Sequence, residues 1–244
     1  MSKKRNPILS AFMADLPLIS ILAGLLIIAG VIIIPARFFQ FFGGEVTRVE
    51  TEDKVVALTL DDGPDPKYLT ETLATLAQYH VKATFFLIGK EIDAHPAAAK
   101  QIVAAGHEVG NHSYSHRSLV FMPHGRLEAE IELTDAAIRR AGYKGAIPFR
   151  PPYGHKFISL PAYLKAHDRP TVLWSIAPDD DPVKNSAADL SARVERDVKP
   201  GSIIILHVME DHRAESRKAL NQFIPALQAK GYEFVTVSDL LTRR

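Results

Sequence analysis

Two adjacent carboxylates follow an apolar stretch in the first third of the chain. The sequence LTLDDGP, residues 58–64, places Asp61 and Asp62 directly before a glycine and a proline that turn the chain. Two carboxylates this close cannot both ionise cheaply unless a cation neutralises one of them. On its own the pair is more typical of a turn that caps a helix, because aspartate is a common N-cap residue.

Two histidines form a second candidate for chemistry. HEVGNHSYSH, residues 107–116, places His112 and His116 four residues apart, the spacing that sets two side chains on one face of a helical turn. Two imidazoles and one carboxylate are a standard ligand set for a divalent metal, zinc above all, with one position left open for water. The spacing alone also arises by chance among surface histidines, but beside an acidic pair it predicts a metal site.

Three further polar clusters stand near the ends of apolar runs. FRPPYG contains Arg150 and Tyr153, and IIILH ends in His207. A histidine at such a place is as often a hydrogen-bonded core residue as a functional one. The acidic run at residues 179–181 follows the only tryptophan, Trp174, and a run of this kind is usually a solvated loop. These clusters indicate chemistry only if the fold brings them together.

The elements that would position these residues alternate between strands and helices. Short apolar runs predict strands that are covered on both faces; they span residues 54–60, 83–89, 107–112, 171–176, 202–207 and 232–237. Amphipathic stretches between them predict helices. This alternation predicts an α/β fold with a parallel sheet, open or closed into a barrel. In such folds functional groups gather at the C-terminal ends of the strands, where these clusters lie.

Composition excludes several classes of function. The chain has 244 residues, of which 47% are hydrophobic and 23% charged, as in globular proteins. Its formal net charge of +1 gives no electrostatic footprint for nucleic acid, so no nucleic-acid partner is expected. The absence of cysteine excludes disulfides, zinc–thiolate sites and a thiol nucleophile.

The N-terminal region predicts a membrane anchor. Residues 16–36 contain no charged side chain and are long enough to cross roughly 30 Å of hydrocarbon as a helix. Lys3, Lys4 and Arg5 precede this span, so residues 1–15 are expected to be a cytoplasmic basic tail, with the rest of the chain outside the cytoplasm. A cleaved signal peptide is the main alternative, although its apolar region would be shorter. Residues 37–53 would then link the membrane to one domain.

In sequence order, the motifs TLDDGP, HSYSH, RPPYG, WSIAPDDD and IILH resemble the five motifs of the polysaccharide deacetylases, carbohydrate esterase family 4. The fourth motif is degraded and the fifth is short. The resemblance implies a distorted (β/α) barrel of about seven parallel strands, here preceded by the transmembrane helix, with residues 54–244 as the catalytic domain. It also implies metal-dependent removal of N-acetyl, or less often O-acetyl, groups from an envelope or exported polysaccharide such as peptidoglycan.

The resemblance also implies which residues hold the metal and activate water. Asp62, His112 and His116 look like the ligands of a divalent metal, with zinc the first expectation. Asp61 looks like the general base that takes a proton from the attacking water. One acid would therefore hold the metal while its neighbour takes the proton.

Four further residues match motif positions with assigned roles. Arg150 resembles the arginine that pairs with the base, and the backbone N–H of Tyr153 would help to stabilise the oxyanion. His207 resembles the general acid that protonates the leaving amine. Asp180 aligns with the aspartate that orients this histidine.

Two departures from the family pattern bear on the substrate. Leu60 replaces a residue that is more often aromatic, and Asp181 stands where the family usually has a tryptophan beside the acetyl site. A carboxylate removes apolar wall there and leaves the identity of the acyl group open. Two alternatives to a glycan deacetylase are a deacylase of a lipid-linked sugar at the membrane surface and a non-catalytic scaffold that binds glycan.

Overall fold

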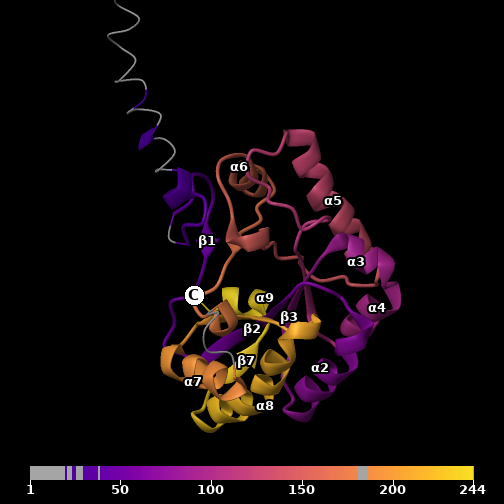
Figure 1. Cartoon of the computed structure of the whole chain (residues 1–244), viewed down its shortest axis with the longest axis vertical. Coiled ribbons are helices and arrows are strands. Elements are labelled where there is room, and N and C mark those ends of the chain that lie inside the picture. The colour runs from indigo at the N-terminus through magenta and orange to yellow at the C-terminus, as the bar shows by residue number, and fades with distance from the viewer. Residues whose placement is uncertain (1–19, 21–23, 26–29, 38, 181–185, 244) are drawn as a thin grey trace, which may run out of the picture.

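The computed structural model of the protein describes residues 20, 24–25, 30–37, 39–180 and 186–243 (Figure 1). The strands in this part of the chain are β1 Glu45–Val46, β2 Val55–Asp61, β3 Thr84–Leu87, β4 Glu108–Asn111, β5 Thr171–Val172, β6 Ile203–His207 and β7 Glu233–Val235. The helices are α2 Pro66–Gln78, α3 Gly89–Ala94, α4 Pro96–Ala104, α5 His124–Arg140, α6 Ser159–Ala166, α7 Ala187–Asp197, α8 Ala214–Ala229 and α9 Val237–Leu241. Short 3-10 helices lie at Pro152–Gly154, Pro178–Asp180 and Asp211–Arg213.

A parallel sheet centred on β2 organises the fold. In order across the sheet the strands are β4, β3, β2 and β6, and β7 pairs with the first half of β2. Each of these pairings is parallel. All seven residues of β2 are buried. This explains why its sequence, VVALTLD, is apolar at consecutive positions instead of alternating with polar residues.

Isolated bridges carry the sheet toward a closed barrel. Phe149 bridges both Asn111 at the end of β4 and Thr171 in β5, and Ile176 bridges Ile204 in β6. β5 also pairs with β1, which lies within the stretch predicted as a linker. The α/β class and the parallel strands predicted from the sequence are confirmed. The architecture is consistent with a distorted barrel in which single bridges connect the β5 side with β4 and β6.

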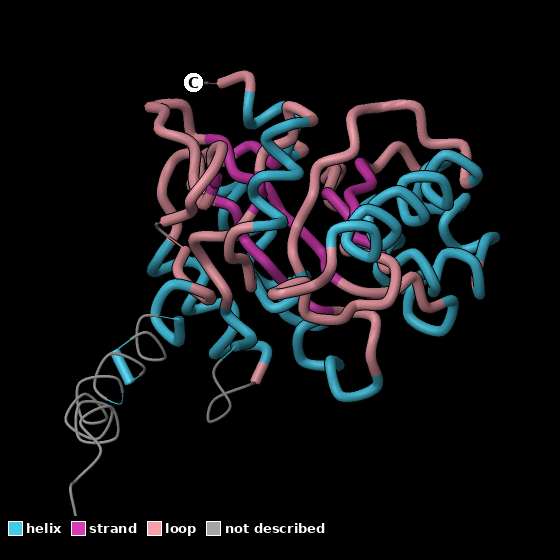
Figure 2. The backbone as a smooth tube through the Cα atoms, turned by 90° about the horizontal axis from the view of Figure 1, so that it is seen from above, coloured by secondary structure: helices cyan, strands magenta, loops and turns pink. Residues whose placement is uncertain are grey.

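Helices surround the strands, as Figures 1 and 2 show. Helix α2 begins at Pro66 because the Asp65 side chain accepts a hydrogen bond from the Lys67 N–H and proline suits the first helical position. Leu69 and Leu76 of α2 are fully buried. Each contributes about 1.5–3 kcal/mol to stability by leaving water. This packing fixes the loop between β2 and α2, where the two carboxylates lie.

The transmembrane helix predicted for residues 16–36 is the part of the fold prediction that is wrong. Among the described residues, no helix is both long enough and apolar enough to cross a membrane. The described end of this stretch joins the domain instead, because the carbonyl groups of Ile34 and Ala36 accept hydrogen bonds from the backbone and the ammonium group of Lys156. The predicted basic tail, and residues 16–19, 21–23 and 26–29 of the predicted anchor, lie outside the described residues.

Candidate active site

Strand β2 ends at the two carboxylates. Asp61 is its last residue, in register with Phe86 of β3 and His207 of β6. Asp62 leaves the extended conformation with a φ of 71° and donates its N–H to the Phe86 carbonyl at 3.1 Å. This turn breaks the alternation of side chains along the strand. Both carboxylates therefore reach one imidazole, with His112 Nε2 3.6 Å from Asp61 Oδ2 and 3.8 Å from Asp62 Oδ1.

The two histidines come from a loop after β4 and not from a helical turn. Asn111 Oδ1 accepts the Ser113 N–H at 2.8 Å, and Ser113 Oγ accepts the His116 N–H at 3.1 Å. These bonds wind the loop so that the ring centroids of His112 and His116 lie 4.9 Å apart. The helical interpretation of the four-residue spacing is wrong, but the loop brings the two imidazoles together as that spacing predicted.

Asp62, His112 and His116 form a group that could hold a metal ion. Their ligand atoms all lie within 4.8 Å of one another. Asp62 Oδ1 is 3.3 Å from His116 Nε2, and it is buried without a hydrogen-bond partner. A buried polar atom left without a partner destabilises the fold by about 1–3 kcal/mol, and more if it is charged. A cation at this point would remove that cost.

The protonation of His112 also fits a metal ligand. Its Nδ1 lies 2.8 Å from the Arg150 carbonyl oxygen, so Nδ1 carries the proton and the lone pair of Nε2 faces Asp62. Burial lowers the pKa of His112 to about 3, which keeps the ring neutral, as coordination requires. The set of two imidazoles and one carboxylate fits a divalent metal and is typical of zinc.

Left-handed backbone conformations concentrate at this site. Seven non-glycine residues in the described part of the chain have positive φ, and four of them are Asp62, Ser113, His116 and Tyr153. Such conformations cost on the order of 1–3 kcal/mol each and persist where surrounding structure enforces them. Their clustering at one end of the strands indicates a functional site.

Arg150 is fully buried and faces Asp61. Its Nη1 donates to Asp61 Oδ1 at 2.5 Å and to Thr59 Oγ1 at 2.7 Å, and its Nη2 donates to the Leu173 carbonyl at 2.9 Å. Burial raises the pKa of Asp61, while the charge and hydrogen bond of Arg150 act in the opposite direction. The remaining oxygen, Oδ2, lies toward the candidate metal ligands, 3.6 Å from His112 Nε2. Asp61 is therefore oriented, and it binds a proton more readily than an exposed aspartate does.

His207 ends β6 and contacts Asp179, not the predicted Asp180. Asp179 Oδ2 accepts the backbone N–H of His207 at 2.9 Å and lies 3.3 Å from its ring Nδ1. Burial disfavours the charged ring, but the hydrogen bond and charge of Asp179, together with the charges of Asp61 and Asp62, outweigh burial and raise the pKa of His207 to about 9. His207 is thus a cation at neutral pH and has a proton to donate.

The acidic run after Trp174 separates into residues with different surroundings. Asp179 is buried, whereas the neighbouring Asp180 is exposed at the rim. Asp181, which stands at the family tryptophan position, lies outside the described residues. The sequence suggested a solvated loop, and nothing in the composition of three consecutive aspartates distinguishes the buried one from the other two.

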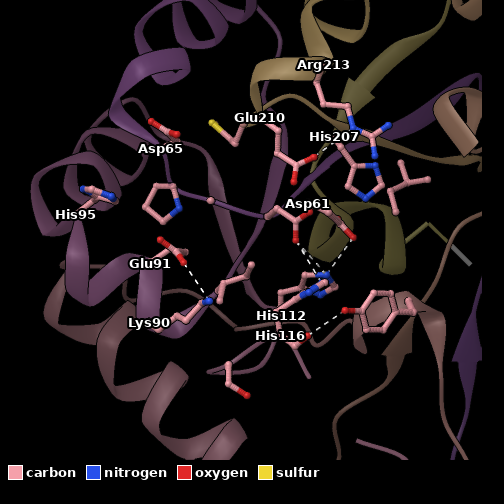
Figure 3. A pocket seen from close by; sticks show the side chains of 18 of the residues that line it. Asp61, Asp65, Lys90, Glu91, His95, His112, His116, His207, Glu210 and Arg213 are labelled. Carbon is pink, nitrogen blue, oxygen red and sulfur yellow. Dashed lines mark hydrogen bonds and ion pairs between the residues drawn. The ribbon is translucent and has the colours of Figure 1, made fainter. Parts of the chain in front are cut away.

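One open cleft of about 910 Å³ is lined by seven of the predicted site residues: Asp61, Asp62, His112, His116, Tyr153, Asp180 and His207. Figure 3 shows Asp61, His112, His116 and His207 converging within it. Tyr153 borders the cleft with 58% of its surface exposed, and its ring centroid lies 4.9 Å from that of His116. The oxyanion role of its backbone N–H stays a prediction.

Several cleft residues were given no role by sequence reasoning. Five of them come from loops and short helices that carry no motif: Lys90, Glu91, His95, Glu210 and Arg213. A sixth, Trp174, opens the fourth motif. Arg213 could have been suspected only from its position a few residues after His207. Its guanidinium contacts Glu210 at 3.3 Å and Asp179 at 3.5 Å.

Comparison with known proteins agrees with this geometry. The sequence model of the family described as polysaccharide deacetylase matches residues 48–170. A peptidoglycan-N-acetylglucosamine deacetylase of Bacillus cereus is 36% identical over 200 residues, which cover 81% of this chain and 93% of that protein. The chain belongs to the polysaccharide deacetylase family. It is a hydrolase, and as a polysaccharide deacetylase it presents the expected acids and histidines in one cleft.

Solved structures of two polysaccharide deacetylase relatives share the fold. A peptidoglycan N-acetylglucosamine deacetylase in complex with 4-naphthalen-1-yl-N-oxidanyl-benzamide aligns with a TM-score of 0.74 at 33% identity, covering 80% of this chain and 91% of that one. A pseudoenzyme of carbohydrate esterase family 4 from Bacillus anthracis aligns with a TM-score of 0.75 at 27% identity, covering 83% of this chain and 70% of that one. The fold alone therefore does not determine activity, and the residues in the cleft matter.

Proposed function

We propose that this polysaccharide deacetylase is metal-dependent and removes the N-acetyl group from N-acetylglucosamine in peptidoglycan. The metal would be held by Asp62, His112 and His116, with zinc as the first candidate. The observation that supports this most directly is the buried Asp62 Oδ1, which lacks a hydrogen-bond partner and lies 3.3 Å from His116 Nε2. The substrate class follows from the named activity of the two deacetylase relatives.

Two protein groups would move protons on either side of the scissile amide. When bound, the metal supplies a Lewis acid that polarises the carbonyl group. Asp61 Oδ2 accepts the proton of the attacking water, while Oδ1 stays hydrogen-bonded to Arg150. His207 then donates its proton from Nε2 to the departing nitrogen, since Nδ1 faces Asp179. The carbon–nitrogen bond breaks, and the products are acetate and a free sugar amine.

The shape of the site suits a polymer. The cleft is open to solvent, as the entry of a sugar within a chain, without a free end, requires. We also propose that the domain acts outside the cytoplasm, where peptidoglycan is located. The absence of cysteine is compatible with an oxidising compartment.

The test is to identify which sugar loses its acetyl group. Purified protein is incubated with peptidoglycan and divalent zinc, and the strands are hydrolysed to fragments whose masses show free amines on glucosamine or on muramic acid. The proposal predicts free amines on glucosamine. Free amines on muramic acid alone, or loss of O-acetyl groups alone, would refute the proposed specificity. A lipid-linked acetylated sugar and acetylated xylan serve as comparison substrates, and preference for either would favour a different function.

A further inference from the structure

A segment that lies upstream of the family match is fixed against the domain. The Lys156 side chain is 1% exposed, donates to the Ala36 carbonyl and pairs with Glu45 at 2.8 Å. The backbone N–H of Lys156 donates to the Ile34 carbonyl at 3.1 Å. Glu45 itself lies in β1, which pairs in parallel with β5. The chain is thus held on both sides of Arg37.

This docking places the Arg37 side chain beside the cleft. Its guanidinium carbon lies 5.6 Å from the ring centre of Trp174, which lines the cleft just after β5. The Arg37 charge also acts favourably on the Asp180 carboxylate at the rim. An arginine packed on an aromatic face keeps the edge of its planar fork of donors available for a carboxylate.

Arg37 differs from Arg150, Arg213 and Lys90 in forming no ion pair with another described residue. Arg150 pairs with Asp61, Arg213 with Glu210 and Asp179, and Lys90 with Glu91 at 3.4 Å. Arg37 is exposed, and no hydrogen bond or ion pair with another described residue engages its guanidinium. It is therefore a cation at the rim that remains available to a ligand.

We propose that Arg37 binds a carboxylate of the glycan on the Trp174 side of the cleft, so that the enzyme prefers acidic strands to neutral ones. The inference rests on the proposed function, because a peptidoglycan strand carries carboxylates next to each N-acetylglucosamine. Their source is the lactyl ether of muramic acid in peptide-free strands, or the attached peptide where one is present. A bidentate contact between arginine and carboxylate fits either source.

The test compares kcat/KM on three substrates. They are a neutral oligomer of N-acetylglucosamine, peptide-free peptidoglycan strands, and peptide-bearing strands. Arg37→Ala should lower the ratio of acidic to neutral kcat/KM on the order of 10-fold, mainly through KM, because a charged contact at a rim contributes to binding and not to bond cleavage. Arg37→Lys should recover part of the ratio, since it keeps the charge but loses the fork. The acidic substrate whose kcat/KM falls in Arg37→Ala identifies the source of the carboxylate.

Controls separate this inference from the proposed function. Arg126→Ala removes an exposed arginine of α5 that does not line the cleft and should leave the ratio unchanged. In the unaltered protein, the preference for acidic strands should fall as salt rises from about 0.05 to about 0.5 M. An Arg37→Ala protein with the wild-type ratio on both acidic substrates overturns the inference. Absence of acetate release from every acetylated glycan by the unaltered protein would instead refute the proposed function.

Discussion

The carboxylate of Asp179 holds His207 at two points, since Oδ2 accepts the backbone N–H at 2.9 Å and lies 3.3 Å from the ring Nδ1. Ser216 Oγ donates to the same oxygen at 3.3 Å. This contact stabilises the imidazolium form, which is the form that can protonate a departing amine. It also assigns to Asp179 the orienting role that the motif alignment had placed on Asp180.

Replacing Asp179 should change the pH dependence of the reaction. His207 has a pKa of about 9, so in the unaltered protein the alkaline limb of kcat/KM should begin near that pH. In Asp179→Asn the ring loses its strongest favourable contact while burial still disfavours the charged form, so this limb should move to lower pH and the maximal rate should fall. A pH–rate profile measures both effects. Asp180→Asn is the matched control, and a larger shift in that variant would return the role to Asp180.

The contact between Asp179 and His207 also predicts how the stability of the fold depends on pH. The pKa of His207 is raised in the folded protein from 6.5 to about 9. The stabilisation from its protonation is therefore fully present below pH 6.5 and is lost as the pH rises through 9. Urea denaturation at pH 6 and pH 9.5 should show a smaller loss of stability in Asp179→Asn than in the unaltered protein. Equal losses in both proteins would mean that Asp179 does not hold the proton on His207.

Metal binding should depend on both loop histidines. His112→Ala and His116→Ala each remove one of three ligands, so bound zinc measured by elemental analysis after dialysis should fall by 10-fold or more, on the order expected when a ligand is lost. His124→Ala, an exposed histidine at the start of α5, is the control and should retain metal. Full metal occupancy in both ligand variants, with an unchanged circular dichroism spectrum, would exclude this site.

The buried pair of Arg150 and Asp61 should serve both stability and rate. Asp61→Asn keeps the shape of the side chain and the three metal ligands, so metal content should persist while kcat falls by on the order of 10²-fold or more. Arg150→Met leaves the Asp61 carboxylate buried without its partner and should lower the free energy of unfolding by about 3–5 kcal/mol. Elemental analysis, kinetics and denaturation measure these effects. An Asp61→Asn enzyme with near-normal turnover would remove this residue from the proton transfer.

Lys156 should control the attachment of the N-terminal segment. Lys156→Met removes the donor to the Ala36 carbonyl and the partner of Glu45. Limited proteolysis should then cut faster near residues 34–46, while the remainder of the domain keeps its protection. Lys144→Met, at an exposed lysine, is the control. Equal cleavage rates in the two variants would show that Lys156 does not hold the segment.

The sequence predicted the parts of the fold that depend on local pattern. The apolar run at residues 54–60 corresponds to β2, which spans Val55–Asp61, and the run at 202–207 corresponds to β6, Ile203–His207. Both strands are covered on each face, so apolar residues stand at consecutive positions in them, VVAL in β2 and IIIL in β6. The two-residue strand β1 was missed because its partner, β5, is distant in sequence and the pairing leaves no periodic signal.

The site was predictable wherever a motif residue acts through its own side chain. Parallel strands end at one edge of the sheet, and buried Arg150 reaches that edge. Six motif residues therefore gather there: Asp61, Asp62, His112, His116, Arg150 and His207. Asp179 was not predictable, since its role depends on a turn that buries one aspartate among three. Arg37 was not predictable either, because its place beside Trp174 results from tertiary contacts of Lys156. The apolar composition of residues 16–36 suggested a membrane helix and gave no sign that Ile34 and Ala36 would contact the domain.

The most direct test of the account is metal-dependent release of acetate from peptidoglycan. Purified protein is treated with a chelator, dialysed, and assayed with and without added zinc for free acetate and for new sugar amines. The account predicts equal amounts of acetate and amine with zinc and background levels of both without it. Equal acetate release from the metal-free and zinc-loaded protein, or none from either while the fold is intact, would contradict it.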